Sequence, residues 1–276
     1  MGEPRPNKGW NRLPAVLRAI VIGMVILVFG QLPAGLIALN LKLAPEIPWF
    51  LAFNILWLWF FWRYLNGWGW PASTSAVRKQ DLRANTISSE VWILSMLAGV
   101  AGLISVMGLI FVISHHTALP EEAYQAPAEF TAYPLRTKVC IFLSMALTAG
   151  VVEEAAFRGY MLSIIQRRHG WLWGILVSSV LFYVVHLSHA YATLSFLPFF
   201  LLYSFLHGYL VYLTGSILLP IVLHFVGDFT VLPMQYGVIA DAGKWPFVHN
   251  GWLSLLALMV AVPLFYKLSR FSRSPT

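Results

Sequence analysis

Apolar residues fill long stretches of this chain, and polar residues are confined to short segments between them. The hydrocarbon core of a bilayer is about 30 Å thick, so an α-helix needs roughly 20 apolar residues to cross it. Pro, Gly and acidic residues gather between the stretches, as is typical of loops. The pattern predicts eight transmembrane helices, at residues 14–38, 48–65, 91–114, 138–160, 171–189, 193–214, 217–236 and 250–267.

Composition supports an all-α, polytopic membrane bundle. Of the 276 residues, 59% are hydrophobic and 11% are Asp, Glu, Lys or Arg, whereas about a quarter of an ordinary soluble domain is charged. These values exclude a soluble globular domain and a disordered chain, and the single Cys140 excludes an intramolecular disulfide. We expect one integrated membrane domain, with three spans in residues 1–137, a motif-bearing core of four spans in 138–236 and one span in 237–276.

The 18 basic residues exceed the 11 acidic ones and give a net charge of +7. Membrane proteins collect Lys and Arg in their cytoplasmic loops, so this surplus does not require a nucleic-acid partner. With the N-terminus in the cytoplasm, the eight predicted spans leave 14 of the 18 basic residues in inner segments. We therefore expect an integral multi-pass membrane protein that is surrounded by lipid, with both termini cytoplasmic.

Six ionisable residues form an ordered pattern inside the predicted spans. They are Glu153, Glu154, Arg158, His186, His224 and Asp228. A charged group at the centre of a bilayer costs at least roughly 2.5–3.5 kcal/mol, so such residues indicate a functional site. His207 also lies in a span and His189 at the end of one, but neither belongs to a motif, and we expect both to be structural.

The spacing of these residues predicts how they pair. Residues four apart share one face of an α-helix, so Glu154 and Arg158 can neutralise each other as an ion pair near the cytoplasmic end of their helix. Glu153 is rotated by about 100° from Glu154 and faces elsewhere, which makes it a candidate general base. Because unpaired polar groups are costly in lipid, we expect the three helices to bring their polar groups together.

Peptide hydrolysis would use these side chains in defined roles. Glu153 and His186 can polarise a water molecule, with Glu153 as the base. His224 can support the oxyanion as a neutral imidazole N–H donor, and Asp228 as a protonated carboxyl group. Glu153, His186, His224 and Asp228 also suit a Zn²⁺ ion with water in its open position, although the His-Glu-x-x-His motif is absent. The residues alone leave a zinc-dependent and a metal-independent mechanism open.

Three motifs on successive helices resemble those of one protease family. Glu-Glu-x-x-x-Arg at 153–158, Phe-x-x-x-His at 182–186 and His-x-x-x-Asp at 224–228 are similar to the motifs of the CAAX protease and bacteriocin-processing family. This family includes the type II CAAX prenyl endopeptidases and is also called the abortive-infection family. The resemblance covers roughly residues 138–236 and implies an all-helical endopeptidase with its site inside the membrane.

The resemblance also implies roles and substrates. Glu153 is then the base, His186 its partner, His224 and Asp228 the oxyanion support, and Glu154 and Arg158 the residues that hold the site. The prenyl endopeptidases usually carry Asn at the position of Asp228. The implied substrate is a peptide or a membrane-associated protein tail, which is lipidated in the prenyl endopeptidases. A non-catalytic scaffold or immunity protein of the same family and a proton-coupled transporter are the alternatives, although no inverted repeat favours the transporter.

Overall fold

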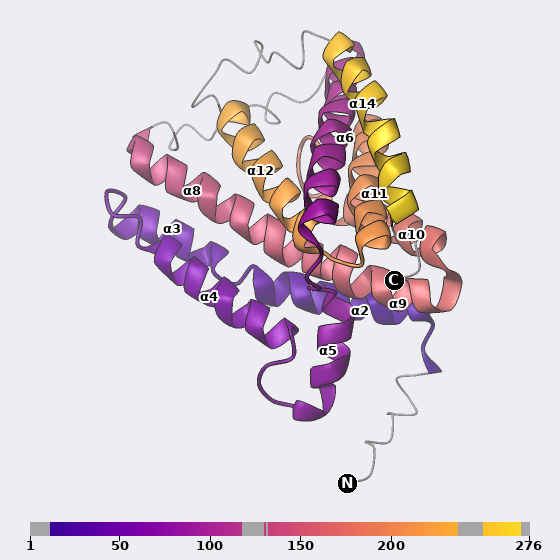
Figure 1. Ribbon diagram of the computed structural model, residues 1–276. Helices are drawn as coiled ribbons and strands as arrows, with labels where there is room; N and C mark the ends of the chain where they lie inside the picture. The colour runs from indigo at the N-terminus through magenta and orange to yellow at the C-terminus, as the bar shows by residue number, and fades with distance from the viewer. Residues whose placement is uncertain (1–11, 118–129, 131, 237–250, 272–276) are drawn as a thin grey trace.

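The computed structural model describes residues 12–117, 130, 132–236 and 251–271, and within these ranges every regular element is a helix (Figure 1). The predicted all-α membrane bundle is therefore confirmed. In chain order the helices are α2 (Ala15–Gly30), α3 (Ala34–Leu43), α4 (Phe50–Leu65), η1 (Ala72–Thr74), α5 (Ser75–Leu82), α6 (Ser89–His116), α8 (Leu135–Thr148), η3 (Ala149–Met161), α9 (Leu162–His169), α10 (Trp171–His186), η4 (Leu194–Phe196), α11 (Leu197–Thr214), α12 (Leu218–Gln235) and α14 (Gly251–Phe271).

Five helical stretches in the described ranges are long and apolar enough to cross a membrane: Ala15–Leu43, Ser89–Ile110, Leu135–His169, Leu194–Thr214 and Trp252–Phe271. Three shorter apolar helices, Phe50–Leu65, Trp171–His186 and Leu218–Pro233, occupy the other predicted spans. A helix of 16 residues such as α4 or α10 is about 24 Å long, shorter than the hydrocarbon core. The number of eight crossings and the orientation of the termini thus stay predictions.

The first predicted span is not one helix. Residues 14–38 are expected to form a single element, but α2 ends at Gly30 and α3 begins at Ala34, with Pro33 at its N-terminal cap. Proline has no backbone N–H to donate within a helix, and its ring clashes with the preceding turn. The break at Gln31–Pro33 is the local consequence of this residue.

The prediction of a plain α-helix over 138–160 is also wrong in part. The chain forms one continuous helix from Leu135 to His169, but its middle third, η3, is a π-helix of 13 residues. π-Helical turns are rare and frequently lie at functional sites, and this one carries the Glu-Glu-x-x-x-Arg motif. Since the helix continues to His169, Arg158 lies well inside it and not near its cytoplasmic end as expected.

The long helix made by α8, η3 and α9 runs through the middle of the bundle. Helices α2 and α4 pack along one side of it, and α10, α11 and α12 along the other, while α14 pairs with α6 (Figure 1). Buried residues of η3, among them Val152, Ala155, Ala156 and Phe157, form the centre of the apolar core. Glu153, Glu154 and Arg158 of η3 contact residues of the second group, whereas the hydroxyl of Tyr160 donates to the carbonyl oxygen of Leu65 on α4.

Helix α4 is fixed to α8 by an amide network. Asn54 is 2% exposed, and its amide nitrogen donates to the hydroxyl oxygen of Ser144 at 2.7 Å and to that of Thr148 at 3.1 Å. Such bonds between polar side chains are a common means of helix association in membranes. This network sets the position of α8, the segment that leads directly into η3.

Helix α12 lies unusually close to η3 at Gly150. A β-carbon at this position would lie 3.0 Å from the carbonyl oxygen of Ile221 and 3.3 Å from the backbone nitrogen of Phe225. Both atoms belong to the backbone of α12, which cannot move aside as a side chain can. Small residues allow helices to approach in this way, and here the approach brings His224 of α12 against η3.

We expect Gly150→Val to push α12 away from η3. Overpacking of this kind costs about 1–3 kcal/mol and also displaces His224, so both the thermal unfolding temperature in detergent and the activity proposed below should fall. Gly35→Val is the matched control, because a β-carbon at Gly35 meets no atom within 4 Å. Equal effects of the two substitutions would contradict the close approach.

Candidate functional site

The three motif helices bring Glu153, His186, His224 and Asp228 into one cluster. The carboxylate oxygen Oε2 of Glu153 lies 3.8 Å from Nε2 of His186 and 3.9 Å from Nε2 of His224. The same Nε2 atom of His224 lies 3.6 Å from Oδ2 of Asp228, one turn further along α12. η3, α10 and α12 thus each contribute at least one group to a space only a few ångströms wide.

The ring of His224 is held between two neighbouring carboxylates. Its Nδ1 lies 2.7 Å from Oε1 of Glu154, while its Nε2 faces Glu153. Glu153 and Glu154 thus lie on opposite edges of one imidazole, and Glu154 pairs with Arg158 whereas Glu153 lies beside His186. A π-helix turns by a smaller angle per residue than an α-helix, so adjacent side chains of η3 diverge less than the α-helical value predicts.

The hydrogen bonds of both histidines determine which ring nitrogen faces the cluster. Nδ1 of His186 lies 2.7 Å from the carbonyl oxygen of Phe182, which can only accept, so this nitrogen carries the proton. Nδ1 of His224 likewise donates to Glu154. Since a neutral imidazole has one N–H, the Nε2 atoms of the two neutral rings are acceptors directed toward Glu153.

This arrangement corrects one expectation about His224. A neutral ring has a single N–H group, which can serve Glu154 or an oxyanion but not both. With Nδ1 donating to Glu154, a donor at Nε2 requires the doubly protonated imidazolium. Support of an oxyanion by His224 is thus cationic in this geometry, and not the neutral donation that the motif alone predicts.

Glu154 and Arg158 form an ion pair beneath the cluster. Nη1 of Arg158 lies 3.0 Å from Oε1 of Glu154, and the side chains are 1% and 0% exposed. The guanidinium also lies 4.4 Å from the centre of the Phe182 ring, a cation–π contact. This pair is the predicted one, and the same oxygen of Glu154 also accepts from His224.

The cluster is open on one side. The side chain of Asp228 is 33% exposed, and those of Glu153 and His186 are 14% and 13% exposed, whereas Glu154 and Arg158 are buried. Solvent or a substrate therefore has access to the groups on the Glu153 side of the cluster, while the ion pair is shielded from both.

Two residues that the motifs do not include lie directly against this site. His207 on α11 is fully buried, with its ring 5.8 Å from that of His224 at an interplanar angle of 11°. Tyr203, one turn earlier, packs edge-on against both imidazoles. The sequence predicts a structural role for His207 and does not place it beside the motif residues. The sequence shows only that His207 is a histidine inside an apolar span, which marks it as unusual but does not identify the residue it contacts.

The four candidate metal ligands are not arranged as a metal site. No group of three or more His, Cys, Asp and Glu side chains within the ranges that the structure describes is placed to hold a metal ion. The nearest donor pairs are 3.6–3.9 Å apart, wider than the separation of about 3.3 Å that tetrahedral zinc bonds of 2.0–2.1 Å imply. These donors lie further apart than around a bound zinc ion, and the zinc ligand set stays a prediction.

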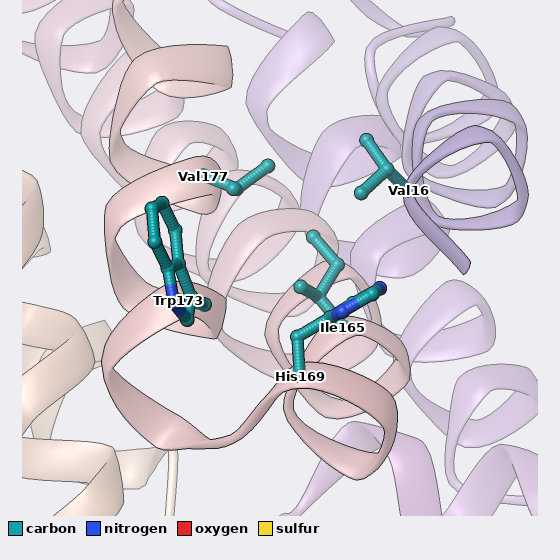
Figure 2. A pocket seen from close by; sticks show the side chains of 5 residues that line it. All are labelled: Val16, Ile165, His169, Trp173 and Val177. Carbon is teal, nitrogen blue, oxygen red and sulfur yellow. The ribbon is translucent and has the colours of Figure 1, made fainter. Parts of the chain in front are cut away.

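A separate cavity lies between α2, α9 and α10. It has a volume of about 380 Å³ and is lined by Val16, Ile165, His169, Trp173 and Val177 (Figure 2). None of the motif residues lines this cavity, which is situated near the far ends of the helices that carry Glu153 and His186. The cluster of Glu, His and Asp side chains, and not this apolar cavity, is the candidate active site.

The fold and the cluster together define a helical membrane protein with acidic and imidazole groups converging inside its bundle. Residues 135–230, about a third of the chain, match the family model described as type II CAAX prenyl endopeptidase Rce1-like. All six motif residues lie within the matched segment. The match confirms the resemblance over these residues.

One curated relative has an unassigned function. An Escherichia coli protein described as an uncharacterized 24.3 kDa protein is 28% identical over 145 residues. The matched part is 50% of this chain and 64% of that protein, so this chain spans less than two thirds of the length of that relative. No solved structure matches the chain.

Proposed function

We propose that this protein is a membrane-embedded endopeptidase that hydrolyses peptide bonds with water activated by Glu153 and His186. The observation that carries the proposal is the separation of 3.8 Å between Oε2 of Glu153 and Nε2 of His186. Both atoms are acceptors in the neutral-ring arrangement, and a contact beyond 3.5 Å between polar groups is typical of a bridging water. One water molecule can donate a hydrogen bond to each, and its oxygen lone pair then faces outward.

Hydrolysis proceeds from this arrangement in two steps. The water oxygen attacks the carbonyl carbon of the scissile bond while Glu153 takes one water proton, and the carbonyl oxygen becomes an oxyanion. Collapse of the tetrahedral intermediate breaks the C–N bond, and Glu153 returns the proton to the leaving amine. The products are a new carboxyl terminus and a new amino terminus, with Glu153 restored.

His224 and Asp228 would stabilise the oxyanion from the open side of the cluster. Doubly protonated His224 donates from Nε2, and a protonated Asp228 donates from its carboxyl group, which lies 3.6 Å away. Preorganised donors of this kind each contribute about 10²–10³-fold to the rate. An ionised Asp228 would instead repel the oxyanion, so this role depends on its proton.

Asp228→Asn separates this role from that of a metal ligand or base. The amide of Asn donates without needing a proton from solvent, so we expect the variant to retain the turnover of the wild type, whereas Asp228→Ala should lower it by about 10²-fold. The measurement is the initial rate of cleavage for the three proteins in the same liposomes. Equal losses in the Asn and Ala variants would contradict donation by residue 228.

The substrate we propose is a peptide or protein tail held at the membrane, in line with the family description. The test is incubation of purified protein in liposomes with a library of prenylated and unprenylated peptides, followed by mass spectrometry for new internal termini. Elemental analysis and a chelator arm of the same assay test the zinc prediction. A wild-type protein that cleaves none of the peptides, with or without added zinc, would favour the scaffold alternative.

A further inference from the structure

His207 and Glu154 both carry unused hydrogen-bonding atoms in the fully buried layer beneath the candidate active site, as does the guanidinium group of Arg158. Both ring nitrogens of His207 and the Oε2 atom of Glu154 are buried and have no hydrogen-bond partner in the structure. Nδ1 of His207 lies 3.8 Å from Oε1 of Glu154. Buried polar groups nearly always find a partner, because an unsatisfied one costs about 1–3 kcal/mol.

The side chains around His207 offer it one charged acceptor. Its ring stacks parallel to that of His224, and Tyr203 packs edge-on against it with a centroid distance of 4.4 Å. The nearest charged group of opposite sign is Glu154. The ring of His207 thus lies between the ring of Tyr203 and the buried carboxylate of Glu154.

Glu154 in turn determines the orientation of His224. Its Oε1 atom accepts from Nδ1 of His224 at 2.7 Å and lies 3.0 Å from Nη1 of Arg158. A carboxylate that is free to rotate could exchange these two contacts for others. A third donor fixes its plane and so fixes which nitrogen of His224 faces Glu153.

We propose that His207 is a positioning residue that donates from Nδ1 to Glu154 and thereby keeps the Nε2 atom of His224 directed toward the reacting water. The inference deepens the proposed function and rests on it for its effect on rate. The separation of 3.8 Å closes to a hydrogen bond when substrate fills the site, as is common for active-site contacts that are long without ligand.

Two substitutions separate positioning from core packing. In Asn the amide nitrogen occupies nearly the place of Nδ1, so His207→Asn keeps the donor, whereas Leu has similar bulk and no donor. We expect His207→Leu to lower kcat by about 10- to 100-fold with KM unchanged, and His207→Asn to stay within about threefold of the wild type. If His207 only filled the core, the Asn variant would lose more activity than the Leu variant, because Leu suits an apolar core better than Asn.

A second readout does not depend on any substrate. Nitrogen NMR of protein labelled with ¹⁵N in its histidine rings reports which ring nitrogen of His224 is protonated. We expect Nδ1 of His224 to be protonated throughout in the wild type and His207→Asn, and only in part of the molecules in His207→Leu. Exposed His169 provides the control, since His169→Ala should change neither kcat nor the signal of His224.

The outcomes distinguish the two proposals. An unchanged His224 signal and unchanged kcat in His207→Leu would overturn the positioning role while leaving the proposed hydrolysis intact. A changed His224 signal in a protein that cleaves no peptide would instead support the positioning contact and count against the endopeptidase.

Discussion

Replacement of Glu153 by Gln is expected to lower peptide cleavage by about 10²- to 10⁴-fold, the contribution of a general base. Gln has the same shape as Glu but cannot take a proton from water at the Oε2 position. The substitution breaks no hydrogen bond at Oε2 of Glu153, which has no hydrogen-bond partner among the described residues. Stability and substrate binding should therefore be preserved, so that the loss appears in kcat alone.

Glu46→Gln is the matched control for this substitution. Glu46 is also a glutamate in contact with a basic residue, Arg136, but its side chain is 65% exposed and lies outside the cluster. We expect the Glu46→Gln protein to cleave the peptide at the rate of the wild type. A Glu153→Gln protein that is folded and cleaves as fast as Glu46→Gln would contradict the assignment of the base.

Arg158→Met is expected to destabilise the protein by about 3–5 kcal/mol, because it leaves the fully buried Glu154 without its counter-ion. The loss of the cation–π contact with Phe182 acts in the same direction. The measurement is the free energy of unfolding in one detergent. The exposed Arg136–Glu46 pair provides the comparison, since Arg136→Met should cost at most about 1 kcal/mol.

A double substitution separates stability from function. Glu154→Gln combined with Arg158→Met removes both charges, so most of the lost stability should return, as is often found when a buried ion pair is replaced as a unit. Activity should stay low, because the carboxylate that accepts from Nδ1 of His224 is gone. A single Arg158→Met variant as stable as the wild type would contradict a structural ion pair.

The positions of the helices could largely be predicted from the sequence, because apolar length alone determines which segments suit a bilayer. The motif residues that meet were also predictable, since their cost in lipid requires partners. Their relative angles were not. The π-helical geometry of η3, which sets the angle between Glu153 and Glu154, has no signature in hydrophobic spacing.

The contribution of α11 to the site could not be predicted from the sequence either. His207 is one histidine in an apolar helix, and its contact with Glu154 joins residues 53 positions apart in the chain. Only the packing of α11 against η3 and α12 reveals that contact. Pro33 alone did not predict the break that it accompanies, because proline can either kink or end a helix and α14 continues through Pro263.

The most direct test of hydrolysis at this cluster is the cleavage rate of one peptide substrate by wild type and Glu153→Gln in matched liposomes, with new termini quantified by mass spectrometry. We expect products from the wild type and a loss of about 10²-fold or more in the variant. Equal rates for the two proteins, with both shown to be folded, would contradict it.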